Sequence, residues 1–191
     1  MTGHRSITET EKTVQEKLGD IPLQWESMAA VANIYRAAAA TRHHVENSVL
    51  REVELTWTGF VVLWVVWIFG EMETRNVAEE AGISKGTLTG VARTLEARGL
   101  VRRSAHATDG RMVLLALTQA GEALMRRLFP AFNAEEAFVT ARLSSADSLQ
   151  LADLLRRIVA QLEETGEQRR LELLAGAAPQ PRRGGRRKNG R

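Results

Sequence analysis

Only three residues, Gly82-Ile83-Ser84, separate two short helical segments, and this tight corner limits how the chain can fold more than any other feature. Glycine reaches the left-handed backbone conformation that ends a helix, and serine accepts hydrogen bonds from the free amides that begin the next helix. Ile83 before the serine and Leu88 four residues after it predict a hydrophobic staple that fixes the angle between the helices. The segments, expected at residues 74–81 and 84–98, therefore form a helix-turn-helix corner.

The second of these helices has two faces of different character. One face is apolar and follows the spacing of a helix side that packs on a core: Leu88, Val91, Ala92 and Leu95. The opposite face is small, hydroxyl-bearing or basic near the start of the helix: Lys85, Thr87, Thr89, Gly90 and Arg93. Such residues suit contact with base edges and phosphates in the DNA major groove. An ordinary amphipathic surface helix has the same pattern, so the helix by itself leaves both interpretations open.

The residues after this helix favour DNA binding. Residues 100–117 contain two apolar runs around the pair Asp109-Gly110, which predicts a β-hairpin. Aspartate and glycine are ordinary turn residues, so the pair needs no further explanation. An arginine at the hairpin tip, Arg111, suits the narrow and electronegative minor groove of A/T-rich DNA.

The remaining segments are predicted to be helical. A helix that is rich in alanine is expected from Leu23 to Leu50, and a shorter N-terminal helix, capped by Thr8 with Glu11, is expected to end near Gly19. Thr56 is expected to cap a segment that ends at Phe69 before Gly70. The many valines of this segment also suit a buried strand, but its helical neighbours favour a buried helix.

Two helices are predicted after the hairpin. The first begins at Thr118 and runs toward Leu143, with a kink or break before Pro130. The second is capped by Ser144 or Ser145 and runs to about Glu164 or on to Leu174. Its apolar residues form one stripe, which includes Leu151, Leu155, Ile158 and Leu162.

At this point the chain resembles the multiple-antibiotic-resistance regulator (MarR) family of winged-helix proteins. The resemblance lies in residues 78–85 (AEEAGISK), residues 95–103 (LEARGLVRR), Asp109-Gly110-Arg111, and Leu117-Thr118 with Gly121. It covers roughly residues 23–164. The resemblance implies a mainly α fold with a small β-hairpin wing, in which the terminal helices form a dimerisation domain.

The resemblance also implies site residues. The second helix lies in the major groove, Arg111 enters the minor groove, and Asp109 orients it. The expected DNA-binding residues are Ser84, Lys85, Gly86, Thr87, Thr89, Gly90, Arg93, Arg103, Asp109 and Arg111. The expected dimer contacts are Leu151, Leu155, Ile158 and Leu162. Gly86 and Gly90 depart from the family, which often has serine and arginine there, and they remove side chains that read bases.

The family commonly binds small aromatic or phenolic effectors, for which the candidate residues here are Tyr35, His43, Trp57 and Trp64. The aromatic residues are also explained by core packing. His43 and His44 are adjacent and diverge on a helix, so we expect no metal site from them and no cofactor. The chain lacks cysteine and every common catalytic motif, and we expect no enzyme activity.

Composition excludes other classes. The longest apolar run, Phe60 to Phe69, is too short to cross a membrane, and the first twenty residues lack the apolar stretch of a secretion signal. A cytoplasmic protein without membrane contact is therefore expected. From Ala175 onward there are six basic residues and no acid, whereas the rest of the chain has three more acids than bases. This tail either tracks DNA phosphates or acts only as a solubilising terminus.

The sequence thus predicts a homodimeric repressor that binds double-stranded DNA at a pseudo-palindromic operator and is released by an effector. Residues 1–21 are expected to be a polar extension, 22–55 and 118–175 the dimerisation domain, 56–117 the winged helix-turn-helix, and 176–191 a disordered basic tail. The alternatives are a sequence-tolerant DNA binder without an effector, and a winged-helix protein-interaction module.

Overall fold

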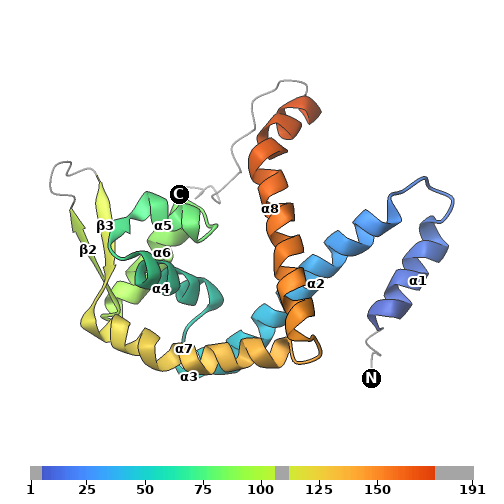
Figure 1. The fold of residues 1–191 in the computed structure, drawn as a ribbon. Helices are drawn as coiled ribbons and strands as arrows, with labels where there is room; N and C mark the ends of the chain where they lie inside the picture. The colour runs from blue at the N-terminus through green and yellow to red at the C-terminus, as the bar shows by residue number, and fades with distance from the viewer. Residues whose placement is uncertain (1–5, 106–111, 175–191) are drawn as a thin grey trace, which may run out of the picture. The chain divides into compact units, whose positions relative to one another are not determined.

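The computed structural model describes residues 6–105 and 112–174. The chain divides into two compact units, Met1–Val139 and Thr140–Arg191. The elements of the first unit are α1 (Ile7–Leu18), α2 (Trp25–Asn47), α3 (Val49–Glu52), α4 (Trp57–Phe69), β1 (Met72–Glu73), α5 (Thr74–Glu80), α6 (Lys85–Ala97), β2 (Val101–Ala105), β3 (Val113–Leu117) and α7 (Gln119–Val139). The second unit contains α8 (Ser145–Leu173) (Figure 1). The described residues are mostly helical with one small sheet, which confirms the expected mainly α winged fold.

The helix-turn-helix corner forms as its residues predict. Gly82 adopts a φ of 63° after α5, in the left-handed region that glycine reaches without strain. The side chain of Ser84 accepts a hydrogen bond from the Thr87 backbone amide at 3.1 Å and so caps α6. Gly99, with a φ of 68°, follows the end of α6 and turns the chain into β2.

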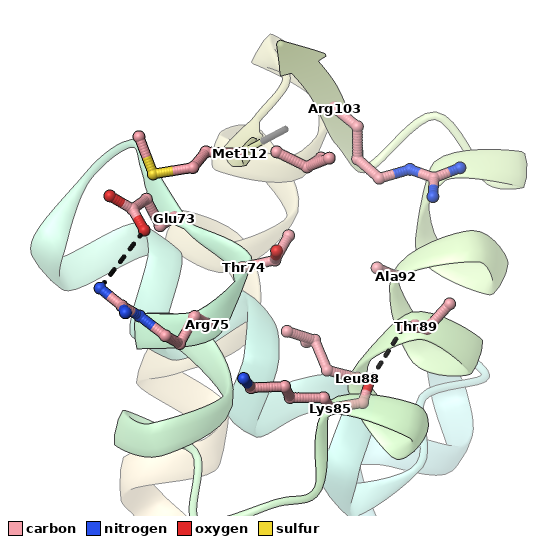
Figure 2. A pocket seen from close by; sticks show the side chains of 10 residues that line it. Glu73, Thr74, Arg75, Lys85, Leu88, Thr89, Ala92, Arg103 and Met112 are labelled. Atoms are coloured by element: carbon pink, nitrogen blue, oxygen red, sulfur yellow. Dashed lines mark hydrogen bonds and ion pairs between the residues drawn. The ribbon is translucent and has the colours of Figure 1, made fainter. Parts of the chain in front are cut away.

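The hairpin belongs to a three-stranded antiparallel sheet with the order β1-β3-β2. In β2 and β3, Arg103 pairs with Leu115 and Ala105 pairs with Val113. The short strand β1 was not expected, and it pairs Glu73 with Leu114. The hairpin borders a hollow that α5 and α6 line from the other side (Figure 2).

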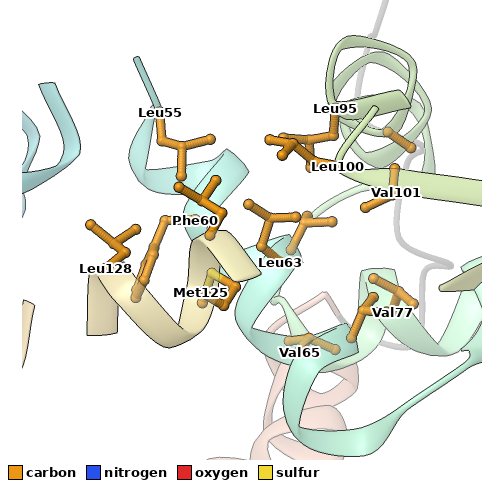
Figure 3. Close-up of a cluster of buried hydrophobic side chains, with 14 of the residues drawn as sticks. Leu55, Phe60, Leu63, Val65, Val77, Leu95, Leu100, Val101, Met125 and Leu128 are labelled. Atoms are coloured by element: carbon orange, nitrogen blue, oxygen red, sulfur yellow. The ribbon is translucent and has the colours of Figure 1, made fainter. Parts of the chain in front are cut away.

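Helix α4 is at the centre of the core. Its residues Phe60, Val62, Leu63, Val65 and Val66 are at most 4% exposed, and it contacts α2, α5, α6, α7 and β3. Figure 3 shows part of this cluster, in which side chains from α4 meet those from α5, α6 and α7. The expectation of a buried helix is confirmed, because burial on nearly all sides explains a segment with no polar face.

Three local predictions were wrong. Helix α1 is capped by Ser6 with Glu9 in a capping box, not by Thr8 with Glu11. The long helix ends at Asn47 and a short helix starts at Val49, with the chain turning at Ser48. Helix α7 continues through Pro130 and ends at Val139.

The packing of α7 explains its continuity. Phe129 and Phe132, on either side of the proline, stack on the aromatic rings of α4, with Phe132 only 4.1 Å from Phe60 between ring centroids. These contacts hold both halves of α7 on the core, which offsets the backbone hydrogen bond that proline cannot make.

Helix α8 has no buried residue in the described chain. Ser144 and Asp147 form its capping box. No single helix among the described residues is long and apolar enough to cross a membrane. Only a pair of segments bent by 75°, Trp25–Glu52 with Trp57–Phe69, passes the same test of length and composition.

Candidate nucleic-acid interface

The outer face of α6 is polar and exposed, whereas its inner face packs on the core. Leu88, Ala92 and Leu95 are each 2% exposed and anchor the helix on the core. The residues expected to bind DNA on the opposite face are all exposed: Lys85, Gly86, Thr87, Thr89, Gly90 and Arg93. The division into two faces matches the sequence pattern, so this face is free for a ligand in the described chain.

The polar groups at the start of α6 are partly used within the helix. Thr87 shares a hydrogen bond of 2.8 Å between its hydroxyl and that of Ser84, and the Thr89 hydroxyl donates to the Lys85 carbonyl at 2.9 Å. An added Cβ at Gly90 would meet no atom within 4 Å, and at Gly86 only the Ser84 hydroxyl, at 3.9 Å. The two glycines therefore leave open space on the outer face and are not required by internal packing.

A hollow of about 490 Å³ separates α6 from the wing strands. Its lining residues are Glu73, Thr74, Arg75, Lys85, Leu88, Thr89, Ala92, Arg103, Met112 and Val113. Figure 2 shows Thr89 and Ala92 on the α6 side and the Glu73–Arg75 pair on the α5 side, with Lys85 extending from α6 toward that pair. Three of these lining residues were expected to bind DNA: Lys85 and Thr89 of α6, and Arg103 of the wing.

Thr74, Arg75 and Met112 were not expected at this site. Thr74 and Arg75 begin α5, the first helix of the corner, and the sequence pattern drew attention only to the second helix. The sequence did carry a signal for them, because the first helix of the corner begins with a hydroxyl-bearing residue and a basic residue, Thr74 and Arg75. Because β1 pairs with β3, the start of α5 is held beside the wing, where such groups face the same hollow.

Arg103, an expected DNA contact, is bound within the protein. Its guanidinium forms an ion pair with Glu96 of α6, with Nε donating to Glu96 Oε2 at 2.9 Å. This hydrogen bond lowers the pKa of Glu96 and raises that of Arg103. The pair joins β2 to α6, so the structure gives Arg103 a role in holding the wing beside α6.

The far end of α6 is also fixed. Arg98 donates from its two terminal nitrogens to the backbone carbonyls of Glu54 and Val53, each at 2.7 Å. The Thr118 hydroxyl donates to the Gly99 carbonyl at 2.5 Å and also accepts from the Gly121 amide at 3.1 Å. These contacts tie the end of α6 to the loop before α4 and to the start of α7.

Two of the expected wing residues, Asp109 and Arg111, lie outside the described residues, as does the expected basic tail, residues 176–191. Strands β2 and β3 on either side are described, and they pair residue 105 with residue 113. The roles of Asp109 and Arg111 stay predictions.

The candidate effector residues are not brought together into a cavity. Trp57 and Trp64 belong to an aromatic stack along α4 and α7, where Trp64 lies 4.7 Å from Phe129 between ring centroids. Tyr35 is 73% exposed on α2, and the His43 ring is 3.2 Å from the Asn47 side-chain amide. The structure therefore supports packing for the tryptophans, while their role toward an effector stays a prediction.

The two adjacent histidines diverge. His44 Nε2 lies 2.5 Å from Glu135 Oε2 of α7, and its ring stacks on Phe138, whereas His43 contacts Asn47 on its own helix. Among the described residues, no group of three His, Asp or Glu side chains is arranged to hold a metal ion.

The stripe on α8 is accessible in the described chain. Leu151, Leu155, Ile158 and Leu162 are 37% to 64% exposed. They recur at spacings of four, three and four residues, which places them on one side of the helix.

The capped corner, the exposed face of α6 and the flanking antiparallel hairpin define a winged helix-turn-helix, a class of DNA-binding protein. The model of the MarR family matches residues 55–113. The uncharacterized HTH-type transcriptional regulator YwaE of Bacillus subtilis is 32% identical over 165 residues, which cover 85% of this chain and 96% of the relative. The chain belongs to the MarR family, whose members are DNA-binding transcription regulators and not enzymes.

Solved structures share the fold. One is BpsR of Bordetella bronchiseptica, described as regulated in DNA binding by 6-hydroxynicotinic acid. It is 27% identical, with a TM-score of 0.62, and the match covers 68% of this chain and 98% of that one. Another is a mutant of MarR from E. coli in complex with operator DNA, 21% identical, with a TM-score of 0.64 over 70% of this chain and 95% of that one. The second likeness supports the fold alone.

Proposed function

We propose that this regulator is a homodimeric repressor that recognises a pseudo-palindromic operator in double-stranded DNA. The observation that carries the proposal is the exposed outer face of α6 beside the wing, across a hollow of about 490 Å³. In this arrangement Lys85, Thr89 and Arg93 meet the major groove. Arg111 enters the minor groove, and Asp109 orients it.

The dimer is proposed to form through the terminal helices, residues 22–55 and 118–175, with residues 56–117 as the DNA-binding lobe. The support is the apolar stripe on α8, because large apolar side chains that are about half exposed in one chain are typical of a surface that a partner covers. Two lobes related by a twofold axis place their recognition helices about one turn of DNA apart, roughly 34 Å. Occupied promoter DNA then excludes polymerase, which makes repression the expected outcome.

An aromatic or phenolic effector is proposed to release the DNA. The support is the regulation of BpsR by 6-hydroxynicotinic acid, a small aromatic acid. Tyr35, His43, Trp57 and Trp64 are the candidate contacts. Such a ligand acts only by binding one separation of the two lobes better than another.

The test is fluorescence anisotropy of the purified protein on DNA from upstream of its own gene and on a scrambled duplex, at about 0.15 M salt. A preference of about a thousandfold or more supports specific operator binding, and Arg111→Ala is expected to weaken it. Equal binding to both duplexes would support the sequence-tolerant alternative. Binding to neither would favour the protein-interaction module. In vitro transcription from the same promoter then separates repression from activation.

A further inference from the structure

Three arginines of α5 and the wing strand β2 are each paired with a glutamate. Arg75 pairs with Glu73 at 3.6 Å, Arg102 pairs with Glu71 at 3.0 Å, and Arg103 pairs with Glu96. The described part of the interface therefore carries acids among its cations, and phosphate binding by these arginines must compete with carboxylates of the same chain.

Only in the pair of Arg75 with Glu73 do both residues line the hollow. The hollow lies between α5, α6 and the wing, and Figure 2 shows this ion pair at its edge. The Arg75 side chain is 60% exposed, whereas that of Glu73 is 25% exposed. The guanidinium is thus open to an incoming anion, and the backbone of Glu73 is held by the pairing of β1 with β3.

A second cation faces the same space. Lys85 lines the hollow from α6 and extends toward the Arg75 side, and it makes no ion pair among the described residues (Figure 2). An anion between α5 and α6 would therefore meet one ammonium group and one guanidinium group, with a single carboxylate beside them.

From this geometry we propose that Arg75 and Lys85 form a binding site for a backbone phosphate of DNA. In the free protein, the carboxylate of Glu73 pairs with Arg75 and competes for this site. On binding, the phosphate replaces the Glu73 carboxylate as the partner of Arg75. Because phosphate carries no sequence information, Glu73 lowers the affinity for all duplexes to a similar degree. The inference rests on the proposed placement of this face against DNA.

The test is a double-mutant cycle of Glu73→Gln and Arg75→Gln. The probe is a scrambled duplex of about 30 base pairs, long enough for two half-sites. Binding is measured by anisotropy between about 0.05 and 0.2 M salt. Glutamine has the size of glutamate and removes its charge, and in place of Arg75 it leaves a shorter, uncharged polar side chain. Glu122→Gln is the matched control, because Glu122 pairs with Arg126 at 2.7 Å on α7 and does not line the hollow.

Glu73→Gln is expected to bind the duplex roughly twofold to fivefold more tightly. Arg75→Gln is expected to weaken binding, and Glu73→Gln in that background should change affinity by less than about twofold. Glu122→Gln is expected to match the wild-type protein.

The proposal is overturned if Glu73→Gln binds as the wild type does or more weakly. It is also overturned if the variant gains the same factor with and without Arg75, since this would mean plain repulsion between Glu73 and DNA. A scrambled duplex keeps this test separate from operator preference, so a regulator without a specific operator still answers it. A wild-type protein that binds no duplex refutes the placement of this face and the proposal together.

Discussion

Replacing Gly121 by alanine tests whether α7 must touch the backbone that follows α6. A Cβ at this position would lie 2.0 Å from the Leu100 carbonyl oxygen and 3.3 Å from a methyl carbon of Leu117. The same carbonyl accepts a hydrogen bond from the Thr118 amide at 3.1 Å. The carbonyl therefore cannot move away from the new methyl group without loss of the bond that joins the hairpin to α7.

The magnitude follows from two opposing effects. Forcing an extra methyl group into a packed site usually costs about 1 to 3 kcal/mol. We use the upper value, about 3 kcal/mol, because the new methyl group would meet backbone atoms, which cannot move aside as a side chain can. Alanine has a higher helix propensity than glycine, which stabilises the folded state by about 1 kcal/mol. The net loss in the free energy of unfolding is about 2 kcal/mol, which lowers Tm by about 4 to 8 °C for a chain of this length.

The measurement is thermal and urea unfolding followed by circular dichroism, at one fixed protein concentration because association changes apparent stability. Gly90→Ala is the matched control, since its Cβ meets no atom within 4 Å on the outer face of α6. It is expected to raise stability by about 1 kcal/mol. If Gly121→Ala melts at or above the wild-type temperature while Gly90→Ala shows its gain, the argument for close contact at Gly121 is refuted.

Three further predictions concern other parts of the molecule. The Trp57 amide donates to Glu46 at 2.8 Å and holds the pKa of Glu46 below its usual value. This carboxylate therefore stabilises the fold above its ordinary pKa, and the advantage is lost as the pH falls. Glu46→Gln should thus cost about 1 kcal/mol in urea unfolding at pH 7, and less as the pH falls below the ordinary pKa of a glutamate; a cost that does not change with pH would contradict the role of its charge. Ile158→Asp, on the exposed stripe of α8, should convert the dimer to monomer in sedimentation equilibrium, and an unchanged mass would rule out this stripe as the dimer contact. Gly90→Ala should weaken binding to operator DNA about tenfold, equivalent to about 1.4 kcal/mol, if α6 approaches the groove closely; unaltered affinity would mean that this face stays clear of the bases.

Local signals made much of the fold predictable. Thr56, Ser84 and Ser144 cap their helices as expected, and Gly70 and Gly82 end theirs, because each of these residues acts through the backbone next to it. The buried helix α4 was predicted from its neighbours, since its own pattern fits either a helix or a strand.

Features that depend on distant residues were missed. Strand β1 has only two residues, and its pairing with β3 defines it. The sequence around Pro130 predicts a kink or a break, whereas α7 runs through Pro130 as one helix whose aromatic residues pack on α4.

The candidate site shows the same division between local and distant effects. The exposed residues of α6 were predicted from helical spacing alone. The ion pair between Arg103 and Glu96 joins residues seven apart in different elements, and that of Arg75 with Glu73 spans the start of a helix. A basic residue in a sequence therefore indicates a candidate phosphate contact, but its free charge is known only when its neighbours in space are known.

The fixation of α6 at both ends has a consequence for selectivity. The Ile83 amide donates to the Ala78 carbonyl of α5 at 2.9 Å and ties down its start, while Arg98 and Thr118 hold its end through the backbone carbonyls of Val53, Glu54 and Gly99. In the proposed function α6 meets the major groove, and a helix held in this way presents the same side chains to every operator. A signal that weakens DNA binding then lowers the affinity for all operators by one common factor, and their rank order is preserved.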